Sequence, residues 1–164
     1  CFFTTVSPAP GWYACRARCE GMSWHDHLQS RLLEMRPASV YALDEAARQM
    51  ARRVLQDTPV CAPGNPPDSL CALALGIDAL NGLNLQQAQH LINQTRLYIA
   101  PRILLAVQSD CVLDEATFRA LGFTLSAADT TQDRRIHYYD LDTYKTVPDW
   151  LNSRYWAHPE RWQP

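Results

Sequence analysis

The sequence predicts a mainly α fold: a single-domain, irregular bundle of about five to six helices, stabilised by disulfides, with room for one small C-terminal β-hairpin. Three observations support this prediction. Apolar residues recur at helical spacing through most of residues 22–122. Residues that favour helix N-caps precede several of these stretches. The chain of 164 residues also carries six cysteines, an even number that is typical of a disulfide framework.

The first two predicted helices span residues 24–35 and 40–54. Ser23 is a suitable N-cap for the first, and Pro37 disfavours its continuation. Ser39 is the expected N-cap of the second. An apolar stripe at spacings of three and four predicts one amphipathic helix there: Val40, Leu43, Ala47, Met50 and Val54.

Residues 57–68 are rich in proline and glycine and predict a loop. The third predicted helix spans residues 69–81 and is apolar on several faces, so we expect it to be the central, most buried helix. Asn84 is the expected N-cap of a fourth helix over residues 85–99.

The remaining elements are shorter. Short helices are predicted over residues 102–108 and 115–121, the latter with Asp114 as N-cap and Gly122 after its end. Residues 124–133 predict a polar loop. Residues 135–141 are rich in β-branched and aromatic residues and predict a strand, with a second extended piece at 143–147. A last helix is predicted over residues 149–156.

This pattern divides one domain, residues 1–164, into three parts. Residues 1–21 predict an irregular N-terminal lead, residues 22–122 a helical core, and residues 123–164 an extended, aromatic-rich C-terminal segment. The length suits one domain of ordinary size.

The cysteines favour an oxidising compartment. We expect a Cys61–Cys71 bond, which would close the proline-rich loop and contribute about 2–3 kcal/mol, and a bond from Cys111 to Cys15 or Cys19. Cys1 is a candidate lipid anchor, because a cysteine is the first mature residue of a bacterial lipoprotein. These features predict a periplasmic or outer-membrane-anchored location, with Cys1 as the only membrane attachment.

One arrangement could support catalysis. Cys71 lies in the first turn of a predicted helix, where the helix dipole favours a thiolate. His137 and Asp140 follow on a later extended segment, which is the general layout of papain-like cysteine hydrolases. The chain lacks that class's local motif, and a Cys61–Cys71 bond would abolish the nucleophile.

Other chemistry finds little support in the sequence. Cys15 and Cys19 with His25 and His27 match no usual zinc spacing, so no metal site is predicted. Phosphate-loop, dinucleotide and nucleophile-elbow motifs do not occur, and no cofactor is predicted. The formal net charge of −2 argues against a nucleic-acid partner.

The C-terminal segment carries a concentration of aromatic residues. Tyrosine, tryptophan and arginine are enriched at interface hot spots, so these residues form the predicted binding surface: Tyr138, Tyr139, Tyr144, Trp150, Arg154, Tyr155 and Trp156. The alternative is that these rings clamp the segment onto the body of the domain.

Together these features predict an extracytoplasmic bacterial protein-binding domain, such as an accessory subunit of an envelope machine or an inhibitor or immunity protein. Its partner would be another protein. The alternative is a cysteine-nucleophile hydrolase that uses Cys71 and His137, and a third class is a carrier with a pocket between helices.

Overall fold

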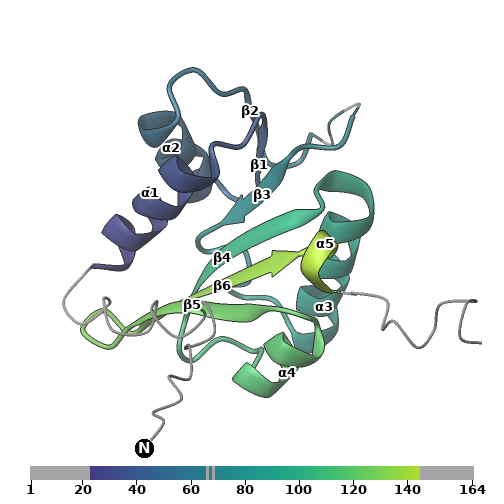
Figure 1. The fold of residues 1–164 in the computed structure, drawn as a ribbon. Helices are drawn as coiled ribbons and strands as arrows, with labels where there is room; N and C mark the ends of the chain where they lie inside the picture. The colour runs from purple at the N-terminus through teal and green to yellow at the C-terminus, as the bar shows by residue number, and fades with distance from the viewer. Residues whose placement is uncertain (1–22, 66, 68, 145–164) are drawn as a thin grey trace, which may run out of the picture.

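A six-stranded sheet runs through the computed structural model, which describes residues 23–65, 67 and 69–144 (Figure 1). The strand order is β2-β1-β3-β4-β6-β5. The first four are β1 (Val40–Ala42), β2 (Val60–Cys61), β3 (Leu73–Gly76) and β4 (Arg102–Gln108), and they are parallel. The last two, β5 (Thr124–Asp129) and β6 (Arg134–Asp140), are antiparallel to each other, and β6 is antiparallel to β4.

Helices cover both faces of this sheet (Figure 1). One face packs against α1 (Trp24–Met35) and α2 (Glu45–Val54). The opposite face packs against α3 (Leu85–Gln94), which continues as the π-helical turn η1 (Thr95–Ile99), and against α4 (Glu115–Ala120). A short helix, α5 (Leu141–Tyr144), follows β6. The domain is therefore a three-layer α/β/α structure.

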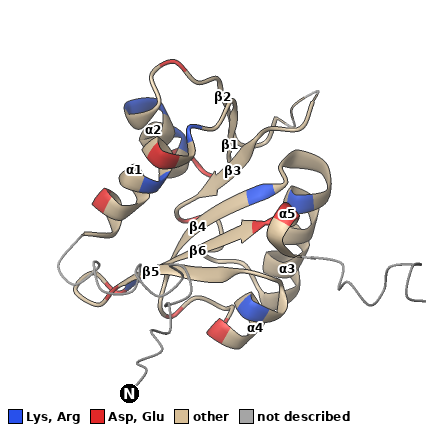
Figure 2. Cartoon of the chain, in the orientation of Figure 1, with Lys and Arg blue, Asp and Glu red and all other residues tan. Residues whose placement is uncertain are grey.

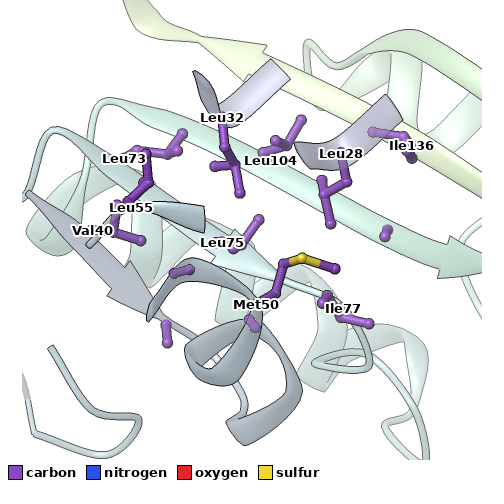
Figure 3. Packing of buried hydrophobic residues seen from close by; sticks show 14 of the residues in the cluster. Leu28, Leu32, Val40, Met50, Leu55, Leu73, Leu75, Ile77, Leu104 and Ile136 are labelled. Carbon is purple, nitrogen blue, oxygen red and sulfur yellow. The ribbon is translucent and has the colours of Figure 1, made fainter. Parts of the chain in front are cut away.

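Alternate strand residues supply two separate cores. Leu104 points toward α1 and α2, whereas its neighbours Ile103 and Leu105 belong to the core under α3 and α4. Figure 3 shows the first of these cores, with Leu28 and Leu32 of α1 lying over the strands. A strand that is buried on both faces needs apolar residues at every position, which explains the uninterrupted run in β4.

The mainly α prediction is therefore wrong, and the errors fall on the parallel strands. The expected helix over 40–54 is strand β1 followed by α2, with Asp44 as N-cap. Ser39 caps no helix, because its hydroxyl accepts a hydrogen bond from the Ala72 backbone. The expected helices over 69–81 and 102–108 contain β3 and β4, since runs that are apolar on all sides also suit strands of a covered sheet.

Two expected loops also contain strands. β2 lies within 57–68, and β5 occupies most of 124–133. The predicted strand at 135–141 is confirmed as β6, but its partners are β4 and β5 rather than a following strand. The extended piece expected from Thr143 begins inside α5.

Several predicted helices are confirmed. Ser23, Asn84 and Asp114 are the N-caps of α1, α3 and α4. Gly122 adopts a positive φ of 91° directly after α4, the conformation expected of a helix-terminating glycine. The part of the chain that the structure describes contains no helix that is long and apolar enough to cross a membrane.

Candidate ligand-binding edge

The carboxyl ends of the four parallel strands meet at one edge of the sheet. α2 follows β1 on one face and α3 follows β3 on the other, so the chain changes direction between these two strands. In open α/β sheets, ligands bind outside the carboxyl ends of the strands at such a switch point. The residues that follow β1, β3 and β4 therefore form the candidate ligand-binding edge.

Asp44 occupies the switch point with its own carboxylate. Oδ1 accepts a hydrogen bond from the Ala47 backbone at 2.7 Å and so caps α2. Oδ2 accepts hydrogen bonds from the backbone N–H groups of Ile77 and Asp78 at 2.7 and 3.2 Å. These three donors are backbone groups of the kind that bind an anionic ligand at a helix N-terminus. Here the protein supplies the anion itself.

The Leu43 side chain packs against Gly76 at the end of β3, in the same space between β1 and β3. A Cβ built on Gly76 would lie 3.2 Å from Leu43 Cδ1 and 2.8 Å from Leu105 Cδ2. Gly76 therefore lets the leucine side chains approach the end of β3. Residues 43–54 include no glycine, so α2 begins directly after Asp44 without a glycine-rich turn. A cofactor cradle of the dinucleotide-binding type is not present between β1 and α2.

Arg134 at the start of β6 holds the turn after β3. Its guanidinium lies 2.9 Å from the Asp78 carboxylate and donates to the Ile77 carbonyl at 3.1 Å. It also lies 4.8 Å from the ring centre of Trp24, a cation–π contact. The Trp24 indole N–H in turn donates to Gln132. The turn after β3 is thus anchored from both the β1 side and the β6 side.

A cavity of about 390 Å³ lies between the segment that follows β3 and the end of β4. Two loops line it: the one after β3 (Leu80, Asn81, Gly82, Leu83) and the one after β4 (Gln108, Asp110, Cys111, Val112). Its polar groups are two carboxamides, a carboxylate and a thiol, and no Lys or Arg is among these described lining residues. Asn81 donates to Asp78 at 3.1 Å, which connects the cavity to the Arg134 anchor.

A second, smaller cavity of about 240 Å³ lies on the other side of the same turn, between α1, α2 and β6. Arg134, Asp78 and Trp24 line it, and all three are already engaged with one another. The cavity beside Asn81 is therefore the better candidate site. The sequence alone does not identify its residues as ligand-binding groups, because the apolar runs of β3 and β4 predict helices and so do not bring the loops after them together.

The structure separates the residues of the predicted hydrolase. Cys71 precedes β3, and its backbone N–H donates to Ile99. His137 lies in β6 opposite Leu105, which pairs with Gly76, so it is two strands across and five residues along from Cys71. At about 3.3 Å per residue the offset along the strand alone is roughly 16 Å. No nucleophile–base contact is possible.

Each of these groups also has other partners. The Cys71 thiol is buried and lies 3.9 Å from the Cys61 sulfur, and burial raises its pKa. Asp140 accepts from the Tyr138 hydroxyl at 3.0 Å and lies 3.6 Å from Arg102. His137 stacks on Phe118 with ring centres 3.9 Å apart. The pKa of His137 is lowered to about 4, chiefly by burial.

The expected disulfide framework is not observed in the described residues. Cys61, Cys71 and Cys111 are free thiols, and the predicted Cys61–Cys71 bond is wrong because the two sulfur atoms lie 3.9 Å apart. Cys1, Cys15 and Cys19 lie outside the described residues. Residues 23–65, 67 and 69–144 include no cluster of three His, Cys, Asp or Glu side chains that could hold a metal ion.

The predicted aromatic binding surface is only partly described. Tyr139 is buried at 1% exposure, Tyr138 is half-buried and Tyr144 is exposed. Trp150, Arg154, Tyr155 and Trp156 lie outside the described residues.

The fold defines the chain as an open, three-layer α/β domain with a cavity at the carboxyl ends of its strands. The chain belongs to a protein family described as a family of unknown function (DUF6231), whose model matches residues 22–164. No curated protein sequence matches it.

Three solved structures are similar in fold. An rRNA methylase from Escherichia coli has 18% identity and a TM-score of 0.42, with 70% of this chain and 62% of that chain covered. Magnesium protoporphyrin IX methyltransferase (ChlM) from Synechocystis PCC 6803, with bound SAM, has 13% identity and a TM-score of 0.48, with 71% and 77% covered. The 16S rRNA methylase RmtB has 15% identity and a TM-score of 0.49, with 70% and 61% covered. The chain thus spans about three fifths of the length of both rRNA methylases.

These findings correct the function predicted from the sequence. The predicted cysteine hydrolase is wrong because Cys71 and His137 lie too far apart in the sheet for contact. The helical bundle on which the extracytoplasmic binding protein rested is not observed, and the described residues contain no disulfide. The exclusion of a nucleic-acid partner rested on net charge and is withdrawn; two of the three similar structures are described as rRNA methylases. The predicted location outside the cytoplasm stays a prediction.

Proposed function

We propose that this chain is a methyltransferase-like α/β domain that binds a nucleoside-class ligand at the carboxyl edge of its sheet. The ligand site is the cavity between the loops after β3 and β4. The observation that carries the proposal is the chemistry of this cavity: carboxamides and a carboxylate, without a cation among its described lining residues, at the edge where open α/β sheets bind ligands.

The cavity's size and polar groups suit such a ligand. Its volume of about 390 Å³ falls within the usual range for small-molecule sites, roughly 300–1,000 Å³. Carboxamides such as those of Asn81 and Gln108 can pair with the edge of an adenine base. A carboxylate such as that of Asp110 can accept hydrogen bonds from ribose hydroxyls.

Charge sets the preference within this class. Asp110 and the nearby Asp78 carboxylate repel phosphate groups, and the Arg134 guanidinium is already paired with Asp78. We therefore expect neutral or cationic nucleosides to bind and nucleotides with phosphate chains to be disfavoured.

The residues at the switch point do not fit S-adenosylmethionine bound in a glycine-rich turn. Asp44 and Leu43 fill that position, and residues 43–54 provide no glycine for the turn. We therefore derive no methyl-transfer step.

Thermal unfolding and calorimetric titration with four ligands test the proposal. Adenosine and S-adenosylhomocysteine should bind and raise the melting temperature, whereas ATP and NAD⁺ should not. At a concentration 100 times Kd, a ligand stabilises the folded state by about 2.7 kcal/mol, which such a scan detects easily.

Variants locate the site. Asp110→Asn and Asn81→Ala should weaken adenosine binding, and Asp57→Asn at the opposite edge of the sheet serves as the matched control. The proposal fails if adenosine does not bind at millimolar concentration, if ATP binds as tightly as adenosine, or if the Asp110 and Asp57 variants behave alike.

A further inference from the structure

An apolar patch lies at the amino edge of β4, on the side opposite the candidate ligand site. The three most exposed large apolar side chains among the described residues are Tyr98, Leu70 and Leu97, at 66%, 63% and 62%. Leu141 and Tyr144 of α5 are exposed as well, at 47% and 37%. We call these five residues the η1 patch.

Two backbone hydrogen bonds bring the segments of the η1 patch together. The N–H of Cys71, next to Leu70, donates to the carbonyl of Ile99, next to Tyr98, at 2.8 Å. The N–H of Leu141 donates to the carbonyl of Pro101 at 3.0 Å. Three segments far apart in the sequence thus meet where η1 leads into β4. Five of the nine exposed large apolar side chains in the described part of the chain lie in these segments. Contiguous exposed apolar surface on a domain normally marks a surface that something covers.

The chain itself supplies a suitable cover at this place. α5 carries two residues of the patch, and residues 145–164 follow it in the sequence. They include Trp150, Trp156 and Trp162 together with Tyr155. An extended chain of 20 residues reaches up to roughly 66 Å, so length does not limit its return to η1. The family match continues to residue 164 and so includes this segment.

We propose that residues 145–164 cover the η1 patch and that their tryptophans provide the apolar contacts that Leu97, Tyr98 and Leu70 need. A covering segment from the same chain requires no second molecule and pays no association entropy, because the segment is held close to the patch by α5.

Tryptophan fluorescence of the full chain tests this proposal, since three of its five tryptophans lie in residues 145–164. Leu97→Glu and Tyr98→Glu should each shift the emission to longer wavelength and increase quenching by acrylamide. Leu125→Glu is the matched control, because Leu125 is similarly exposed at 47% but lies on β5. Circular dichroism confirms that each variant is folded.

A chain that ends at residue 144 gives a second measurement, in which an uncovered patch should bind more of a hydrophobic dye than the full chain does. The proposal is overturned if the variants at 97 and 98 quench like the variant at 125, or if truncation leaves dye binding unchanged. It is also overturned if light scattering shows a dimer that Leu97→Glu dissociates, because a second copy would then be the cover.

Discussion

The carboxylate of Asp44 accepts a hydrogen bond of 2.7 Å from the backbone N–H of Ile77, which joins the start of α2 to the turn after β3. The same carboxylate also caps α2 through Ala47. One side chain therefore closes the crevice between β1 and β3 and fixes the turn beside the candidate ligand cavity. Its removal should affect more than one element.

Asp44→Ala should lower the free energy of unfolding by about 2–4 kcal/mol, because it removes a helix cap and leaves two further N–H donors without their charged acceptor. Urea denaturation measures this loss. Asp114→Ala is the control, since the Asp114 carboxylate also caps a helix through one backbone N–H, that of Thr117 in the first turn of α4. We expect about 1 kcal/mol for the control, and equal losses would contradict the bridging role of Asp44.

Gly76→Ala should destabilise the domain by about 1–3 kcal/mol, because the new methyl would overlap Leu105 and crowd Leu43 and Ala79 in a packed core. Gly64 is a suitable comparison. It has a φ of 82° but open space around its Cα, so Gly64→Ala should cost only backbone strain of roughly 1 kcal/mol. Calorimetric scans of both variants measure the difference. A Gly76 variant as stable as the wild type would contradict the close packing at the end of β3.

Arg134→Met should destabilise the fold and alter the fluorescence of Trp24, because it removes the pair with Asp78 and the contact with the indole ring. The Arg134 side chain is only 14% exposed. The free energy of unfolding should fall by about 2–3 kcal/mol, because Asp78 and the Ile77 carbonyl lose their partner. The Arg31–Glu34 pair on α1 offers a contrast, since both side chains are more exposed. Arg31→Met should change stability by less than about 1 kcal/mol, and similar losses for both variants would refute the anchoring role of Arg134.

His137 should make stability depend on pH. Burial disfavours its charged form and lowers its pKa from 6.5 to about 4 in the folded protein, although Glu115 opposes the shift. Between these two values the unfolded chain binds a proton that the folded chain does not. The free energy of unfolding should therefore fall as the pH drops from about 6.5 toward 4, by at most about 3 kcal/mol.

The His137→Phe variant isolates this effect. Phenylalanine can keep the stacking on Phe118 and has no proton to bind. Urea midpoints measured at pH 7 and at pH 4.5 should differ less in the variant than in the wild type. If both chains lose the same stability over this interval, His137 is not the group responsible.

The sequence by itself determined the elements whose signals are local. The N-caps at Ser23, Asn84 and Asp114 locate α1, α3 and α4, because a side chain that accepts from a backbone N–H two or three residues away acts wherever the helix lies. The aromatic and β-branched run at 135–141 likewise identified β6.

Only the tertiary structure decided that residues 73–76 and 102–108 are strands. Their apolar runs suit a buried helix as well as a parallel strand covered on both faces, and only the partners β1 and β6 distinguish the two. The candidate site exists only because these two segments are neighbouring strands. Asn81 and Asp110 lie about 30 residues apart in the sequence and meet only because β3 and β4 pair side by side, which brings the loops after them to one edge.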